Sequence, residues 1–107
     1  MMRKSFVVAM AAIPLAVGIA VAQPVGFPER GRSYAVANCA DCHAVLATDR
    51  SSPVAKATRF VDVANTPGMT ATAVLVWLQT PHPTMPNFVV APDDMRDLAA
   101  YIVSLKR

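Results

Sequence analysis

The hydrophobic pattern is clearest near the end of the chain. Apolar residues recur there at the spacing of one helix face, at Met95, Leu98, Ala99, Ile102 and Leu105. Pro92 suits the first turn of a helix, and Asp93 and Asp94 suit the positive end of its dipole. The pattern predicts an amphipathic helix that begins at Pro92 and runs to the basic residues Lys106 and Arg107.

Three earlier segments also carry helical signals. Pro28 and Glu29 predict a helix over 28–41, and apolar positions at helical spacing predict a short one over 54–65. Thr70 is a suitable cap for a third, over 71–79. No alternating strand pattern, internal repeat or linker accompanies them. We therefore expect one all-α domain of three to four helices.

Two segments between these helices predict loops. Residues 48–53 are polar and end in a proline. Pro81, Pro83 and Pro86 fall within six positions, and this density excludes a regular helix or a central strand. We expect residues 81–88 to form an extended loop with little conformational freedom.

The N-terminal segment, residues 1–22, has the features of a secretory signal peptide. Arg3 and Lys4 precede an apolar run, and the small-x-small sequence Ala20-Val21-Ala22 follows it. Cleavage there would leave a domain of residues 23–107 outside the cytoplasm, in the periplasm of a bacterium. The alternative is an uncleaved membrane anchor, because the apolar run that starts at Phe6 is just long enough for a membrane-spanning helix.

Composition narrows the possible partners. The chain has 107 residues, of which 54% are hydrophobic and 16% charged, and a net charge of +3. Removing the N-terminal segment removes Arg3 and Lys4 and leaves a charge of about +1. No basic patch with interleaved aromatic residues is present, so the sequence gives no support for nucleic-acid binding. After signal cleavage, no segment is predicted to span a membrane.

The sequence Cys39-Ala40-Asp41-Cys42-His43 is the strongest chemical signal. It reads C-x-x-C-H, which is typical of covalent haem attachment. Two thiols at this spacing can react with the two vinyl groups of one porphyrin, while the adjacent imidazole reaches the iron. A thioredoxin-like dithiol lacks its βαβ context here, a zinc site lacks a second close pair of ligands, and a disulfide leaves His43 unexplained. One covalent haem c is therefore the predicted cofactor.

An iron held by His43 needs a second axial ligand from farther along the chain. The downstream donors are Met69, His82, Met85 and Met95. Met69 precedes a predicted helix and Met95 belongs to an apolar stripe, so both are expected to pack in the core. Met85 lies in the proline-rich loop and is the preferred ligand, with His82 as the alternative.

Two neighbours of the iron site can also be named. The second ring nitrogen of His43 needs a hydrogen-bond acceptor, for which we expect a backbone carbonyl near Ser52 and Pro53. Trp77 is expected to pack in the core or against the haem.

Taken together, residues 28–106 resemble a class I monohaem cytochrome c. The resemblance rests on the C-x-x-C-H motif, Met85 between prolines, and the amphipathic last helix with Tyr101. It implies a small fold wrapped around one haem, in which the first and last helices cross closely at Gly31 and Tyr101. It also implies His43 and Met85 as axial ligands, and the Pro53 carbonyl as the acceptor for His43.

The same resemblance implies a function. The protein would be an electron carrier and not an enzyme, it would exchange electrons with redox partner proteins, and it would act as a monomer or as a subunit of a redox complex. Two alternatives stay open: a haem-bearing subunit of a periplasmic dehydrogenase or oxidase, and a ligand-binding or peroxidatic haem protein.

Overall fold

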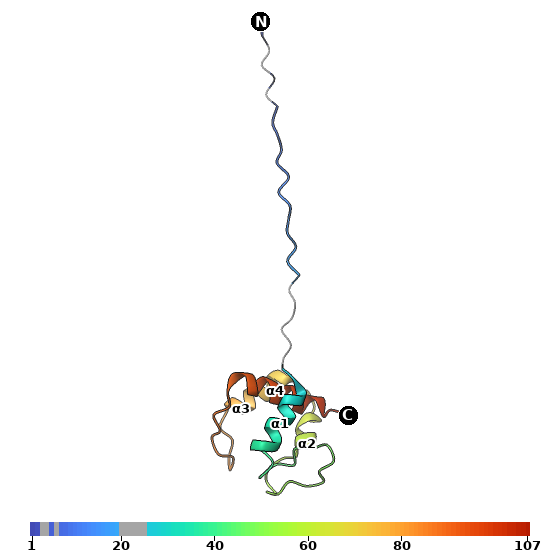
Figure 1. Cartoon of the computed structure of the whole chain (residues 1–107), viewed down its shortest axis with the longest axis vertical. Helices are drawn as coiled ribbons and strands as arrows, with labels where there is room; N and C mark the ends of the chain where they lie inside the picture. The colour runs from blue at the N-terminus through green and yellow to red at the C-terminus, as the bar shows by residue number, and fades with distance from the viewer. Residues whose placement is uncertain (3–4, 6, 20–25) are drawn as a thin grey trace.

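The computed structural model describes residues 1–2, 5, 7–19 and 26–107. In this part of the chain it contains four α-helices and no strand, so the all-α prediction is confirmed (Figure 1). The helices are α1 (Pro28–Asn38), α2 (Phe60–Ala64), α3 (Ala71–Gln79) and α4 (Pro92–Ser104).

The last helix is the centre of the packing, since α1, α2 and α3 all lie against it. It begins at Pro92, and Met95, Leu98, Ala99 and Ile102 of its predicted apolar stripe are buried. The helix ends at Ser104, before the predicted end at the basic residues, and Leu105 is half-buried. The core contains residues from all four helices: Ala35, Phe60, Ala64, Val74, Leu98, Ala99, Tyr101 and Ile102, together with Val45 from a loop. Burial of this stripe fixes the positions of the other three helices relative to α4.

The crossing of α1 and α4 occurs at Gly31, as predicted. A Cβ atom at this position would overlap the backbone carbonyl of Asp97 and lie 2.7 Å from Tyr101 Cβ. Only glycine allows the two helix backbones to approach so closely. Ala35, one turn later on α1, is fully buried in the same interface.

The predicted C-terminal boundary of the first helix was wrong. α1 ends at Asn38 and not at residue 41. The cause is a local turn in which the carbonyl of Cys39 accepts hydrogen bonds from the backbone N–H groups of Cys42, at 3.2 Å, and His43, at 2.9 Å. The C-x-x-C-H sequence therefore follows the helix as a separate turn.

The predicted helix over 54–65 was wrong in its first half, because only Phe60–Ala64 is helical. The preceding residues use their backbone groups elsewhere: Val54 N–H donates to Cys42 O at 3.1 Å, and Phe60 N–H donates to Ala44 O at 2.9 Å. These long-range bonds tie the segment to the motif loop instead of to a helix. By contrast, α3 has its predicted bounds, and the Thr70 hydroxyl accepts from Ala73 N–H at 3.1 Å.

Residues 7–19 lie apart from the four helices (Figure 1). Residues 7–19 are described and contain no helix, whereas Arg3, Lys4 and the predicted cleavage sequence Ala20–Ala22 lie outside the described residues. In the described part of the chain, no helix combines the length and the apolar character needed to cross a bilayer. The signal peptide and the domain boundary at residue 23 stay predictions.

Candidate haem-binding site

The two cysteines lie in the turn that follows α1. Cys39 is half-buried, Cys42 is exposed, and both are free thiols. Burial raises the pKa of the Cys39 thiol to about 11, so this group is protonated at neutral pH. The turn places both sulfur atoms and the imidazole of His43 within one short stretch of backbone.

One ring nitrogen of His43 is already engaged. Its Nδ1 lies 2.7 Å from the carbonyl oxygen of Thr58, and the ring packs against Phe60 with centroids 5.3 Å apart. A carbonyl can only accept, so Nδ1 carries the proton and Nε2 has the free lone pair. This is the tautomer that a ligand to iron requires.

The acceptor for His43 was wrongly predicted. It is Thr58 O and not a carbonyl near Pro53, because the irregular backbone before α2 turns the carbonyl of Thr58 toward the ring. Ser52 has another role: its hydroxyl accepts from Ala44 N–H at 2.9 Å. The sequence did not indicate this role for Thr58, because the helix predicted over 54–65 would have used its carbonyl in an internal hydrogen bond.

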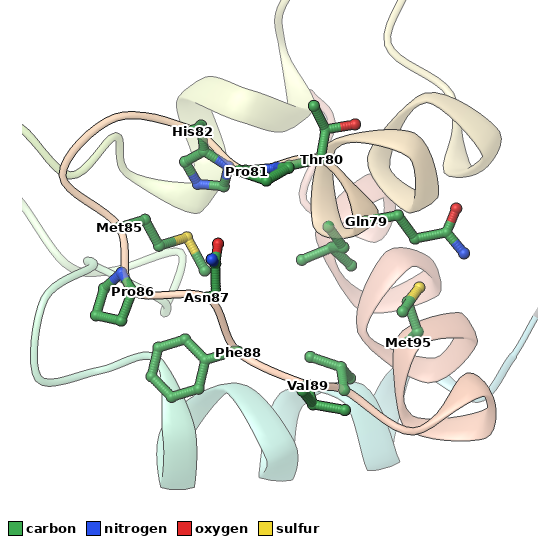
Figure 2. Close-up of a pocket in the computed structure, with 12 residues that line it drawn as sticks. Gln79, Thr80, Pro81, His82, Met85, Pro86, Asn87, Phe88, Val89 and Met95 are labelled. Carbon is green, nitrogen blue, oxygen red and sulfur yellow. Dashed lines mark hydrogen bonds between the residues drawn. The ribbon is translucent and has the colours of Figure 1, made fainter.

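The loop that connects α3 and α4 borders an open hollow of about 310 Å³. Its wall includes residues 78–82, residues 85–90 and the buried side chain of Met95 on α4. Figure 2 shows the thioether of Met85 extending from the loop toward this hollow. The ring of His82 lies in the same wall and meets Trp77 edge-on, with centroids 6.0 Å apart.

The four downstream candidates for the second iron ligand fall into two pairs, one packed against the core and one in the loop. Met95 is buried, and Met69 packs against the core while its carbonyl accepts from Lys106 Nζ at 3.2 Å. Both have the packing roles expected for them. His82 and Met85 both belong to the exposed loop, and a backbone hydrogen bond of 3.3 Å from Met85 N–H to His82 O joins them. These two stay the candidates for the second axial position.

The residues present fit a haem. Two free thiols are suited to covalent attachment of the porphyrin. The imidazole of His43, with a free lone pair on Nε2, and a thioether are donors suited to binding the iron. Large apolar side chains near these donors are exposed, among them Phe88, Val89 and Trp77, the last of which is 57% exposed. The expectation that Trp77 packs in the protein core was therefore wrong, whereas contact with a haem stays a prediction. No cluster of three or more His, Cys, Asp or Glu residues suited to a metal ion occurs among the described residues.

The helical fold around α4, with the C-x-x-C-H turn after α1, is that of a c-type cytochrome. The cytochrome c family model matches residues 28–106, and the chain belongs to this family of electron carriers, which implies a covalent haem c. A curated relative is cytochrome c-552 of Bradyrhizobium diazoefficiens (strain JCM 10833 / BCRC 13528 / IAM 13628 / NBRC 14792 / USDA 110). It is 37% identical over 68 residues, which cover 64% of this chain and 64% of that protein. The chain thus spans less than two thirds of this relative's length. No solved structure matches the chain.

Proposed function

We propose that the protein carries one electron at a time on a single haem c bound through thioethers to Cys39 and Cys42. His43 and Met85 are the axial ligands in this proposal. The observation that carries it is the hydrogen bond from His43 Nδ1 to Thr58 O. This bond leaves the lone pair of Nε2 free to bind iron, on an imidazole that directly follows the two cysteines. Met85 is favoured over His82 because its soft sulfur extends from the restricted loop toward the hollow (Figure 2), whereas the ring of His82 packs edge-on against Trp77.

The haem supplies the iron that gains and loses the electron. The chain contributes orientation: Thr58 O fixes the tautomer and the tilt of His43, and it increases the electron density on the imidazole. A His/Met pair favours the reduced iron relative to a His/His pair and so raises the potential. With both axial positions filled by the protein, no position is left for a substrate, and this agrees with an electron carrier.

The place of action and the partners belong to the same proposal. Residues 1–22 direct export and are then removed, so the haem domain acts in the periplasm. Its partners are a donor and an acceptor protein that dock briefly, with small interfaces. The intact mass of the protein recovered from the periplasmic fraction distinguishes cleavage after Ala22 from a retained N-terminal anchor.

The axial ligands are tested by replacing each candidate separately. In the holoprotein, Met85→Ala should open the iron, so that carbon monoxide binds the ferrous form and shifts its visible spectrum. The parent protein and the matched variant His82→Ala should keep a low-spin spectrum that carbon monoxide leaves unchanged. If His82→Ala opens the iron and Met85→Ala does not, the assignment of Met85 is wrong. Rapid binding of carbon monoxide by the parent protein would favour a ligand-binding haem protein instead.

A further inference from the structure

Two turns of this chain share the same hydrogen bond and the same sign of φ at their third residue. In Thr66–Met69 and in His82–Met85, the N–H of the fourth residue donates to the carbonyl of the first, at 3.0 Å and 3.3 Å respectively. Proline occupies the second position of both turns and restricts φ there to a negative value. The third residue has a positive φ in both, +76° at Gly68 and +71° at Thr84. This combination defines a type II turn.

The two turns differ in the residue at the third position. Glycine is favoured there because it has no Cβ to meet the backbone at positive φ. Thr84 is β-branched, and among the described residues it is the only residue other than glycine with a positive φ. The left-handed conformation lowers the population of such a turn about five- to thirty-fold relative to an unstrained one. The turn that leads into Met85 is therefore strained, while its counterpart at Gly68 is not.

The surroundings show what holds the strained turn in place. Thr84 is exposed, so burial of its own side chain does not offset the strain. Pro83 and Pro86 restrict φ only at their own positions. The restraint next to Thr84 is the side chain of Met85, which is part of the wall of the hollow and holds the end of the turn. Backbone strain persists where the surrounding structure imposes it, and it is found most often at functional sites.

We propose that Thr84 is a positioning residue whose strained backbone weakens the hold of Met85 on the iron. This inference rests on the proposed function. The turn is strained while the thioether is bound and relaxes when the thioether leaves, so the strain favours exchange of Met85 for another ligand. In that exchange the sulfur withdraws its lone pair from the iron, and a nitrogen lone pair of the incoming ligand replaces it. No bond of the chain is broken.

The test is the apparent affinity of the ferric holoprotein for imidazole, followed by loss of the thioether-to-iron charge-transfer absorption. Thr84→Asn should lower this affinity about threefold or more, because asparagine adopts positive φ more readily than a β-branched residue. Thr84→Val is the matched control: it removes the hydroxyl but keeps the β-branch. Its affinity should stay within about twofold of the parent's.

A second control moves the strain to the other turn. A Cβ at Gly68 would meet no atom within 4 Å, so Gly68→Thr changes backbone strain without a steric clash. It should lower the equilibrium constant for folding about five- to thirty-fold and leave the affinity for imidazole unchanged. This variant shows whether strain must lie next to Met85 in order to affect exchange.

The outcomes separate this inference from the assignment of the ligand. A lower affinity in Thr84→Asn, with no change in Thr84→Val and Gly68→Thr, supports the inference. If Thr84→Asn raises the stability of the fold but leaves the affinity unchanged, the strain is the same with Met85 bound or released and the inference is wrong, although Met85 remains the ligand. If the parent protein lacks the charge-transfer absorption, or if Met85→Ala retains it, both the assignment and the inference fail.

Discussion

The crossing of α1 and α4 and the loop between α3 and α4 are held in place by different means. At the crossing, Gly31 lets two backbones touch, and Ala35 and Tyr101 are buried beside it. The loop has exposed side chains, including Val89 at 99%, and its course is restricted by prolines. Tertiary packing fixes the first region, and local covalent restrictions fix the second.

The contrast between these regions indicates which property each substitution should alter: global stability at the crossing, and ligand exchange at the iron in the loop. A buried contact at the crossing is lost only when the whole domain unfolds, so its removal should lower global stability. A restriction in the exposed loop acts within the folded protein, so its removal should alter exchange at the iron while global stability changes little. Each of the following predictions tests this division on the holoprotein, and the largest expected effect comes first.

Gly31→Ala should give the largest loss of stability. The added Cβ would overlap the Asp97 carbonyl, which belongs to backbone and cannot rotate away as a side chain could. We expect the free energy of unfolding, measured with guanidinium, to fall by about 3 kcal/mol or more. Val36→Ala, an exposed position on the same helix, should change it by less than about 0.5 kcal/mol. A similar, small change in both variants would contradict the close crossing.

Tyr101→Phe should have the next largest effect. The buried hydroxyl of Tyr101 donates to Val45 O at 2.6 Å, a bond that connects α4 to the loop after the haem motif. Without it, the Val45 carbonyl is buried with no donor from Tyr101, and we expect a loss of about 1–3 kcal/mol. Unchanged unfolding by guanidinium would show that this hydroxyl contributes nothing to the packed region.

The same residue gives a pH dependence with a definite sign. Burial is the main cause that raises the pKa of Tyr101 above its ordinary value of 10.0. A raised pKa means that the neutral phenol stabilises the fold below pH 10, and that this contribution is lost as the pH rises through the folded-state value. The parent protein should therefore lose stability above pH 10 more steeply than Tyr101→Phe. Parallel stability curves for the two proteins in this range would contradict the expectation.

Asp97→Ala should have a moderate effect. Asp97 is only 4% exposed, and its Oδ1 accepts from Phe27 N–H at 2.8 Å, so this α4 residue caps the start of α1. We expect a loss of about 1–2 kcal/mol on unfolding. Arg30 contacts the other oxygen at 2.9 Å, but its side chain is 61% exposed. Arg30→Ala should therefore cost less than about 1 kcal/mol. Equal losses in the two variants would show that the ion pair, and not the cap, is the important contact.

Pro83→Ala should have the smallest effect on global stability and a measurable one on the loop. Alanine can adopt the negative φ of this position, so the strain at Thr84 is kept while Met85 is bound, but the released loop gains freedom worth about 0.4–1 kcal/mol. This should raise the apparent affinity for imidazole about two- to fivefold, because Met85 leaves the iron more readily. Global unfolding should change by less than about 0.5 kcal/mol, as is usual for an exposed position. A loss of global stability with no change in imidazole affinity would contradict the division between the two regions.

Much of the fold was predictable because the signals were local. The apolar stripe of α4 and the Thr70 cap of α3 each depend on residues within a few positions, and both predictions were confirmed. The prediction of a helix over 54–65 was wrong in its first half, because backbone groups there form long-range hydrogen bonds to Cys42 and Ala44 instead of helical ones. A local pattern cannot show such competition.

The candidate site also has features that the sequence indicated and features that depend on folding. The C-x-x-C-H sequence indicated the haem, and the prolines indicated a restricted loop around Met85. The roles of Thr58 and Asp97 were missed, since each depends on a partner brought near by folding: the ring of His43 in one case and the N–H of Phe27, 70 positions away, in the other. The strain at Thr84 was also missed, because threonine is not a residue that indicates a positive φ.

The all-helical class, the cytochrome c family and the candidate residues for haem attachment were legible in the sequence, because periodicity and close spacing are properties of neighbouring residues. Folding in three dimensions established which carbonyl orients His43, how closely α1 approaches α4, and which of two similar turns is strained. The first two features depend on contacts between distant parts of the chain, and the third depends on a backbone angle that the residue type of Thr84 does not indicate.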